Sequence, residues 1–252
     1  HADLAGVRTK YAANVLALET LKALEASACA PDAEQRTVLN RYTGWGGIKG
    51  PFDPYPHPEW QKEAQQLKSM LSGSEFESAK ESTLNAHYTP LGIVQAIWTA
   101  LANAGFTGGR ILDPASGPGY FIGAMPEEIA RRSSVLCVEL EPTTARIAKA
   151  LYEPHAKVMN MGFEAAQIPD NYFDLVVSNF PFGRYQVACH RRKPYSNWSI
   201  HNWFVGRPLD VVRPGGVVAF ITSSWFMDSD SDKVRAVVAR KAKLVAAYRL
   251  PQ

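Results

Sequence analysis

The chain has 252 residues, of which 46% are hydrophobic and 20% are charged, as expected for one large globular domain or a domain with an appendage. Its formal net charge of +3 permits a nucleic-acid partner without requiring one. The three cysteines fit neither a disulfide framework nor a zinc site, and no membrane-length apolar run or signal peptide is visible, so we expect a metal-free cytoplasmic protein that does not bind a membrane.

The first part of the chain is predicted to be helical. Leucine and alanine at helical spacing predict a helix over 11–28, and a second helix is expected to start at Asp32 with Gln35 as its capping partner. Two more short helices are predicted, one over 59–71 and one capped by Ser74.

A connector rich in glycine and proline interrupts these helices. A regular element is excluded over 43–58, because the prolines there fix φ and lack an amide donor. We favour a connector whose Trp45 and Phe52 pack onto the main domain, and the alternative is a lid or a DNA-facing loop. Residues 1–84 are therefore predicted to form an N-terminal helical subdomain, followed by the main domain over 85–252.

The main domain opens with the peptide His-Tyr-Thr-Pro at 87–90, directly before a helix predicted over 91–103. Thr89 is a natural N-cap, and Pro90 suits the first helical position. Helix capping alone would account for this peptide.

A glycine-containing turn follows the first predicted strand, Ile111-Leu112. The turn reads Asp-Pro-Ala-Ser-Gly-Pro-Gly-Tyr-Phe over 113–121. Gly117 and Gly119 allow positive φ angles and a close approach to a ligand, and the helix that follows presents free N–H groups on the same side. On these residues alone, a ligand-binding turn and an ordinary tight turn are equally open.

A second turn, Asn-Phe-Pro-Phe-Gly over 179–183, follows a buried strand predicted over 173–178. In open α/β sheets, ligands bind outside the carboxyl ends of the strands. Both turns are therefore expected to open onto one crevice.

Cations and aromatic residues are mixed in the segment after the second turn. Its members include Arg184, Arg191, Arg192, Lys193, Tyr185, Tyr195 and Trp198. Cations bind phosphates and aromatic rings can stack on bases, so this segment is a candidate DNA contact. A solvated charged loop is the equal alternative.

Strands and helices alternate through the main domain. Strands are predicted over 111–112, 135–140, 157–159, 173–178, 217–222 and 244–250, and helices between them over 142–152, 200–212 and 231–241. This alternation predicts a doubly wound, mostly parallel α/β sheet of the Rossmann-like type, with the helical subdomain as an N-terminal extension.

Taken together, the Tyr-Thr-Pro peptide, the glycine turn and the Asn-Phe-Pro-Phe loop resemble S-adenosylmethionine-dependent adenine-N6 DNA methyltransferases, which have the class I methyltransferase fold. Those enzymes carry Asp-Pro-x-x-Gly-x-Gly-x-Phe as cofactor turn and Asn-Pro-Pro-Phe/Tyr as catalytic loop. Here Phe180 replaces the first loop proline, and Gly162 replaces an acid. Further matches at 42–47 and 212–216 are similar to the methylase part of large helicase–methylase proteins of phages, plasmids and conjugative elements, among them the DarB-type antirestriction proteins.

The resemblance implies S-adenosylmethionine as cofactor and gives each motif residue a role. The residues implied to bind the cofactor are His87, Tyr88, Thr89, Pro90, Asp113, Pro114, Ala115, Gly117, Gly119, Phe121, Glu139, Phe163, Glu164 and Asn179. Glu139 would hold ribose hydroxyls while Glu141 caps the next helix, or the two roles are exchanged. Phe163 would cover the adenine ring and Glu164 lie beside it, unless they are a core residue and a solvated acid. The residues implied to be catalytic are Asn179, Phe180, Pro181 and Phe182, and those implied to contact DNA are Phe182, Arg184, Arg191, Arg192 and Lys193.

The implied reaction is methyl transfer to the exocyclic N6 of adenine in DNA. The Asn179 side-chain oxygen and the Phe180 carbonyl would accept the amino hydrogens, and Phe182 would stack on a base that is flipped out or single-stranded. The resemblance also implies a helicase module in the same polypeptide, with a last strand and a target-recognition region after Gln252. The alternatives are methylation of RNA or of a protein glutamine, and a non-catalytic module that binds cofactor or DNA.

Overall fold

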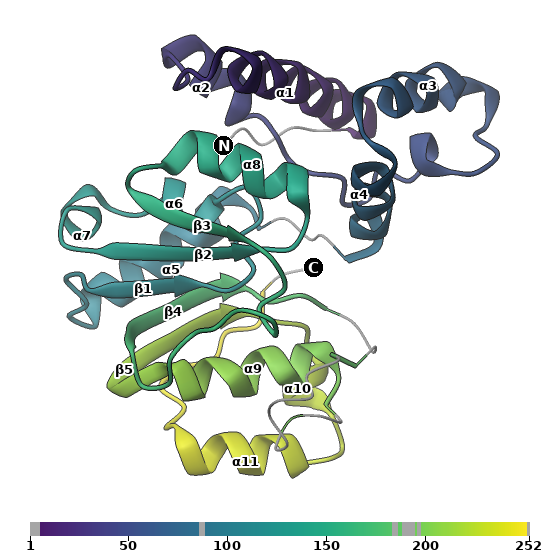
Figure 1. Cartoon of the computed structure of the whole chain (residues 1–252). Coiled ribbons are helices and arrows are strands. Elements are labelled where there is room, and N and C mark those ends of the chain that lie inside the picture. Colours follow the sequence, from purple (N-terminus) through teal and green to yellow (C-terminus); the bar gives the residue numbers. More distant parts are fainter. Residues whose placement is uncertain (1–5, 86–88, 183–185, 188–194, 196–197, 251–252) are drawn as a thin grey trace.

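The computed structural model describes residues 6–85, 89–182, 186–187, 195 and 198–250. Its centre is a five-stranded parallel sheet with the strand order β3-β2-β1-β4-β5 (Figure 1). The strands are β1 (Arg110–Asp113), β2 (Ser134–Glu139), β3 (Ala156–Asn160), β4 (Phe173–Asn179) and β5 (Val212–Ile221). The predicted doubly wound, Rossmann-like α/β sheet is confirmed.

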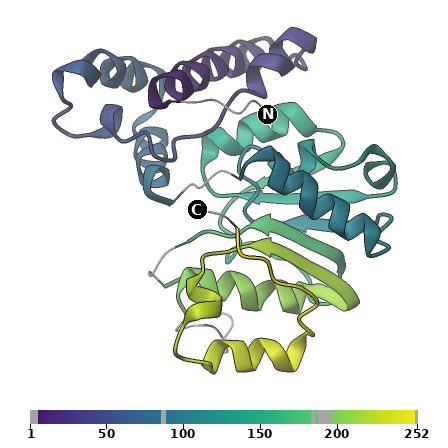
Figure 2. The ribbon, with the colours of Figure 1, turned by 180° about the vertical axis from the view of Figure 1, so that it is seen from behind.

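Each face of the sheet carries its own core, because successive side chains of a strand point to opposite faces. Ile111 and Leu175 face the first group of helices, whereas Leu112 and Val176 face the second. The first group is α5 (Leu91–Asn103), α6 (Tyr120–Gly123) and α7 (Glu127–Ala130). The second group is α9 (Ile200–Val211), α10 (Trp225–Asp228) and α11 (Lys233–Lys241). Figure 2 shows the face that carries α5.

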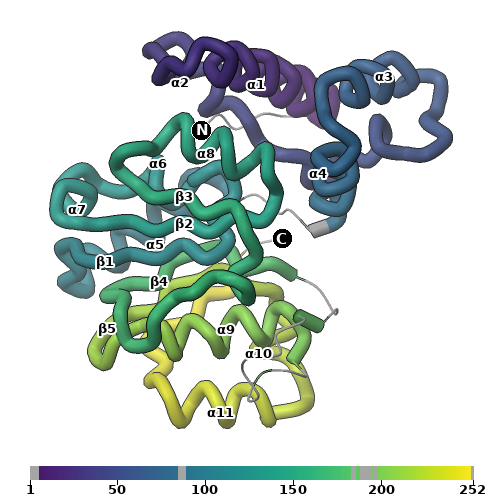
Figure 3. Tube along the Cα trace, viewed as in Figure 1, coloured from purple at the N-terminus to yellow at the C-terminus, as the bar shows by residue number. Residues whose placement is uncertain are grey.

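The N-terminal helices pack against α8 (Pro142–Tyr152), which lies beside β3 (Figure 1, Figure 3). The N-terminal elements are α1 (Val7–Ser27), α2 (Ala33–Leu39), η1 (Gly50–Phe52), η2 (Pro58–Trp60), α3 (Gln61–Met70) and α4 (Gly73–Asn85). Trp45 and Phe52 of the connector are buried, and their cluster includes Ile147 and Leu151 of α8. The burial of these two rings agrees with the interpretation of residues 43–58 as a connector that packs onto the main domain.

The strand predicted over 244–250 is wrong, since residues 242–250 contain no helix or strand. Leu244 is 67% exposed, Val245 90% and Tyr248 84%. An alternating apolar pattern encodes a preference for extended backbone, but a strand also needs a neighbour that supplies hydrogen bonds and a covering face. Among the described residues, β5 pairs on one side only, with β4.

Two predicted helix starts are displaced. Pro90, not Thr89, is the N-cap of α5, and Thr89 makes no capping bond, because the helix begins one residue later at Leu91. Ser72 rather than Ser74 caps α4, since its hydroxyl accepts from the amide of Glu75. The capping box of Asp32 and Gln35 is confirmed. No helix within the described part of the chain is long and apolar enough to span a membrane.

Candidate active site at the carboxyl edge of the sheet

The glycine turn and the Asn-Phe-Pro-Phe loop leave two neighbouring strands at the same edge of the sheet. β1 ends at Asp113 and β4 ends at Asn179, and these strands pair directly. The Ser178 hydroxyl, one residue before Asn179, donates a 2.6 Å hydrogen bond to Oδ1 of Asp113. Both side chains are fully buried. The two turns therefore lie at the same edge of the sheet, joined by a contact that was not predicted from the sequence, and their opening onto one crevice stays a prediction.

The two carboxylate oxygens of Asp113 differ in their hydrogen bonds. Its Oδ1 also accepts from the amide of Ala115, at 3.3 Å, whereas no described residue donates to Oδ2. Burial raises the pKa of Asp113 to about 7, although the hydrogen bonds from Ser178 and Ala115 act in the opposite direction. A buried acceptor without a donor costs about 1–3 kcal/mol, so Oδ2 is suited to a proton or to a donor on a ligand.

The two glycines of the turn, Gly117 and Gly119, differ in what surrounds them. Both have positive φ angles, 53° at Gly117 and 92° at Gly119. A Cβ added at Gly119 would overlap the ring of Tyr152 on α8, so this glycine is required by packing. A Cβ at Gly117 would meet no described atom within 4 Å. Gly117 therefore borders open space at the edge of the sheet, where a ligand can approach the backbone.

Glu139 at the end of β2 holds the other side of the turn. Its Oε2 accepts from the amide of Gly117 at 2.8 Å, and its Oε1 accepts from the amide of Glu141 at 2.8 Å. Burial raises the pKa of Glu139 to about 7. Glu141 caps α8 by accepting from the amides of Thr143 and Thr144, so the helix-cap role falls to Glu141 and not to Glu139.

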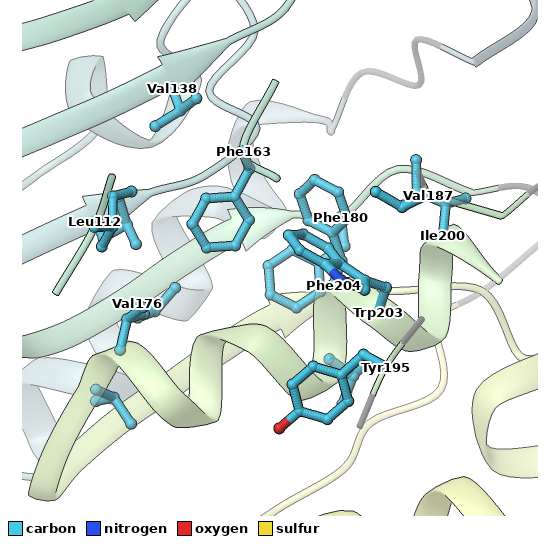
Figure 4. Close-up of a cluster of buried hydrophobic side chains, with 14 of the residues drawn as sticks. Leu112, Val138, Phe163, Val176, Phe180, Val187, Tyr195, Ile200, Trp203 and Phe204 are labelled. Atoms are coloured by element: carbon cyan, nitrogen blue, oxygen red, sulfur yellow. The ribbon is translucent and has the colours of Figure 1, made fainter. Parts of the chain in front are cut away.

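Several other residues of the implied cofactor set lie in or beside the core. Phe163 is 3% exposed and packs on Trp203 and Phe204, with ring centroids 5.3 and 5.6 Å apart (Figure 4). Its surroundings are those of the core residue that the sequence left open as an alternative. Phe121 is likewise buried, and its carbonyl accepts from Trp98 Nε1. Glu164 is partly exposed and folds back over Gly162, where a Cβ would overlap its carboxylate.

The remaining members of that set differ in their access to solvent. Pro114 and Thr89 are buried, Ala115 is partly buried, and Pro90 is exposed. His87 and Tyr88 lie outside the described residues, as do Arg184, Arg191, Arg192 and Lys193 of the implied DNA contact.

The Asn-Phe-Pro-Phe loop presents some residues outward and one inward. Asn179 pairs in register with Ile221 of β5 and is partly exposed, as are Pro181 and Phe182. Phe180 is 1% exposed, with its ring in the core beside Phe204 of α9 (Figure 4). The loop therefore leaves Asn179 and Phe182 partly exposed, with the Asn179 side-chain oxygen itself buried, while the Phe180 side chain lies in the core.

Tyr195 is not available to stack on a base, contrary to one interpretation of its segment. It is 1% exposed, its hydroxyl donates to Asp210 at 3.0 Å, and Lys241 of α11 donates to it. Gly206 of α9 makes room for the ring, because a Cβ there would lie 3.0 Å from Tyr195 and 2.8 Å from Trp198. No sequence pattern distinguished this packed ring from a solvent-facing one.

Neither the role of Ser178 nor the packing of rings around Phe180 was predicted from the sequence. The only signal for Ser178 was a small polar residue at the end of an otherwise apolar strand. Among the described residues, no group of three or more His, Cys, Asp or Glu side chains is placed to share a metal ion.

Comparison with known proteins gives consistent matches. The family model described as "Methyltransferase domain" matches residues 112–191. "Defense against restriction protein B" of Escherichia phage P1 is 29% identical over 248 residues, which is 97% of this chain and 9% of that protein. A type II methyltransferase of Thermus thermophilus is 26% identical over 188 residues, 68% of this chain and 42% of that protein.

The fold is also found in a solved structure. It is described as a modification subunit of a type I restriction enzyme from Vibrio vulnificus, with a TM-score of 0.52 and 16% identity over 74% of this chain and 43% of that one. The chain thus spans less than half the length of each of these relatives.

Proposed function

This chain carries a methyltransferase domain, and we propose that it transfers a methyl group from S-adenosylmethionine to the exocyclic N6 of adenine in DNA. The observation that carries the proposal is the hydrogen bond between Ser178 and Asp113. It ties the strand that ends at Asn179 to the strand that leads into the glycine turn. A donor site and an acceptor site for a methyl group have to lie this close.

The residues at the glycine turn fit the cofactor. Oδ2 of Asp113 can accept from an amino group, and the space beside Gly117 admits a ligand to the backbone. The Glu139 carboxylate already accepts two amides, yet a carboxylate has about four acceptor positions, so it can also accept from ribose hydroxyls. When bound, S-adenosylmethionine supplies a methyl group activated by a sulfonium centre.

Asn179 and Phe180 would act on the target base. The adenine amino group is a poor nucleophile, because its lone pair is delocalised into the ring. The Asn179 side-chain oxygen and the Phe180 carbonyl would accept hydrogen bonds from the two N–H bonds of this amino group. The nitrogen can then rehybridise and point at the methyl group. Two fixed acceptors supply orientation and stabilise the positive charge that develops on nitrogen.

The target base has to leave a duplex, or be single-stranded, to reach this loop. Phe182 is partly exposed beside Asn179 and would stack on the extruded base. The basic residues Arg184 and Arg191–Lys193 would bind backbone phosphates. We further propose that residues 1–84 form a helical subdomain that braces the main domain through α8.

The similarity to the phage P1 protein supports a proposal for the biological setting. Because the relative from phage P1 is named for defense against restriction, we propose that this domain helps to protect incoming DNA of a mobile element. We also propose a helicase module in the same polypeptide, and the resemblance of the sequence to helicase–methylase proteins supports this second proposal.

Methyl transfer from labelled cofactor to separate DNA, RNA and protein fractions tests the function. We expect label in DNA, and we expect Asn179→Ala to abolish it while cofactor binding persists. Asn103→Ala, at the exposed end of α5, is the matched control and should label DNA like the wild type. Label confined to RNA or to protein, or equal DNA labelling by the wild type and Asn179→Ala, would overturn the proposal.

A further inference from the structure

The Asn-Phe-Pro-Phe loop has Phe180 at the position where the methyltransferases that it resembles have a proline. A proline there would stiffen the backbone. The Phe180 ring instead lies flat on the ring of Phe220 in β5, with centroids 4.8 Å apart and planes 15° apart. Phe204 of α9 contacts it from another side, at 5.7 Å and 56°. Phe180 is therefore held by aromatic contacts between the sheet and α9; Figure 4 shows it with Phe204.

The backbone of Phe180 is held as well. Its amide donates a 3.0 Å hydrogen bond to the carbonyl of Ile221, directly after the register pair of Asn179 and Ile221. The ladder between β4 and β5 thus extends one residue into the loop. A proline at 180 could not make this bond, because it has no amide hydrogen.

Both contacts to Phe180, the one to its ring and the one to its amide, come from strand β5. Phe220 contributes the stacked ring, and Ile221, its neighbour in sequence, contributes the acceptor. The two contacts fix both the orientation and the position of the peptide that joins Asn179 to Phe180. This peptide lies between two groups that the proposed function uses, because the Asn179 side chain branches from the residue before it and the Phe180 carbonyl belongs to the next peptide, with Pro181.

We propose that β5 is the positioning element of the catalytic loop and that Phe220 is its principal positioning residue, with Phe204 in support. The stack and the ladder bond replace the stiffness that the missing proline would give. This inference rests on the proposed function, since it concerns the same loop. It has an unusual consequence: restoring the family sequence Asn-Pro-Pro-Phe should impair this protein.

Four single variants test the inference. Phe220→Leu removes the stacked ring, Phe220→Tyr keeps it, and Phe180→Pro removes both the ring and the amide donor. Phe173→Leu is the matched control, because Phe173 lies 3% exposed at the opposite end of β4 and its ring contacts Tyr172 rather than the loop. For each variant, kcat, KM, the Kd for S-adenosylmethionine and the Tm are measured.

We expect Phe220→Leu to lower kcat by on the order of 10- to 100-fold, with cofactor Kd unchanged, because loop groups displaced by about 1 Å lose orientation. Phe180→Pro should lower kcat at least as much, and Phe220→Tyr should retain most of it. Phe173→Leu should lower Tm without lowering kcat. Wild-type kcat in Phe180→Pro, or equal losses of kcat in Phe220→Leu and Phe173→Leu, would overturn the inference.

Amide hydrogen exchange at residue 180, measured without DNA, separates this inference from the proposed function. The Phe180 amide should be protected in the wild type and in Phe173→Leu, and exchange about tenfold faster or more in Phe220→Leu. If the wild type methylates no DNA but shows this pattern, the function fails and the positioning role stands. Equal protection in Phe220→Leu and the wild type would overturn the positioning role, whatever the activity.

Discussion

The Ser178 hydroxyl lies 2.6 Å from Oδ1 of Asp113, and this buried hydrogen bond connects the ends of β4 and β1. Asp113 is the first residue of the glycine turn, and Ser178 directly precedes the Asn-Phe-Pro-Phe loop. A shift of one turn relative to the other would break the bond. The pair therefore sets the distance between the groups proposed to hold the cofactor and those proposed to hold the base.

Ser178→Ala should weaken both the fold and the reaction. Loss of the donor leaves the buried Oδ1 of Asp113 with only the longer, 3.3 Å hydrogen bond from the Ala115 amide, and loss of such a buried hydrogen bond costs about 1–3 kcal/mol of unfolding free energy. Because this hydrogen bond lowers the pKa of Asp113, its removal should raise that pKa further. Urea unfolding and cofactor titration measure the two effects. Ser134→Ala, at the exposed start of β2, should change neither, and a Ser178→Ala protein equal to it would contradict the coupling.

The stability of the protein should depend on pH through Asp113. The carboxyl binds a proton more tightly in the folded state, where its pKa is raised to about 7, than in the unfolded state, where it is about 3.9. Its contribution is therefore fully present below about pH 4 and is lost as the pH rises through about 7. Glu139, whose pKa is also raised to about 7, acts in the same direction.

Urea unfolding of the wild type and of Asp113→Asn from about pH 5 to pH 8 checks this dependence. The stability of the wild type relative to Asp113→Asn should fall across this window, because only the wild type has to ionise a buried carboxyl. Comparison with the variant removes the contributions of other groups, such as Asp174, whose pKa is lowered by hydrogen bonds from Arg110 and Arg213. A constant difference between the two proteins would contradict the raised pKa.

Substitution of Gly117 and of Gly119 by alanine should impair different properties of the protein. Gly117→Ala places a left-handed alanine in open space, at a cost of about 1–2 kcal/mol, and should mainly reduce cofactor affinity. Gly119→Ala adds an overlap with Tyr152 to the same backbone strain and should mainly reduce Tm. Calorimetry of cofactor binding and thermal unfolding of both variants separate the two effects. Equal cofactor affinity in Gly117→Ala and the wild type would contradict a ligand at this backbone.

Trp45 tests whether the glycine- and proline-rich connector is structural. Its ring is fully buried, within 5.3 Å of Phe52 and 6.3 Å of Tyr42 between ring centroids. Trp45→Ala should therefore cost about 3–5 kcal/mol of unfolding free energy, as for other buried aromatic truncations. The folded fraction should keep its kcat. A variant with unchanged stability and reduced kcat would favour the lid or DNA-facing loop instead.

Local signals in the sequence predicted several features whose deciding interaction is also local, although the caps of α4 and α5 lie one or two residues from their predicted positions. The capping box of Asp32 and Gln35, the two glycines with positive φ and the cap role of Glu141 depend on residues at most a few positions apart. The strands around Leu112 and Val176 carry enough apolar residues to be buried on both faces, so the parallel sheet followed as well.

Where a contact joins residues that are distant in the chain, the sequence either gave no indication of it or led to a wrong prediction. Ser178 reaches Asp113 across 65 positions, and Phe180 stacks on a ring of β5 that no motif marks. Tyr195 was taken as a candidate base contact because its polar and charged neighbours in sequence do not reveal its burial against α9. The apolar pattern at 244–250 predicted a strand, but strand formation depends on a partner and not on the pattern alone.

The most direct test of the proposed reaction is the identity of the methylated nucleoside. DNA incubated with the wild type and labelled S-adenosylmethionine is digested to nucleosides, which are separated and identified by mass spectrometry. We predict that the label is in N6-methyldeoxyadenosine and is absent after incubation with Asn179→Ala. Label in a cytosine nucleoside, or no labelled nucleoside from a protein that binds the cofactor, would contradict the proposed chemistry at Asn179.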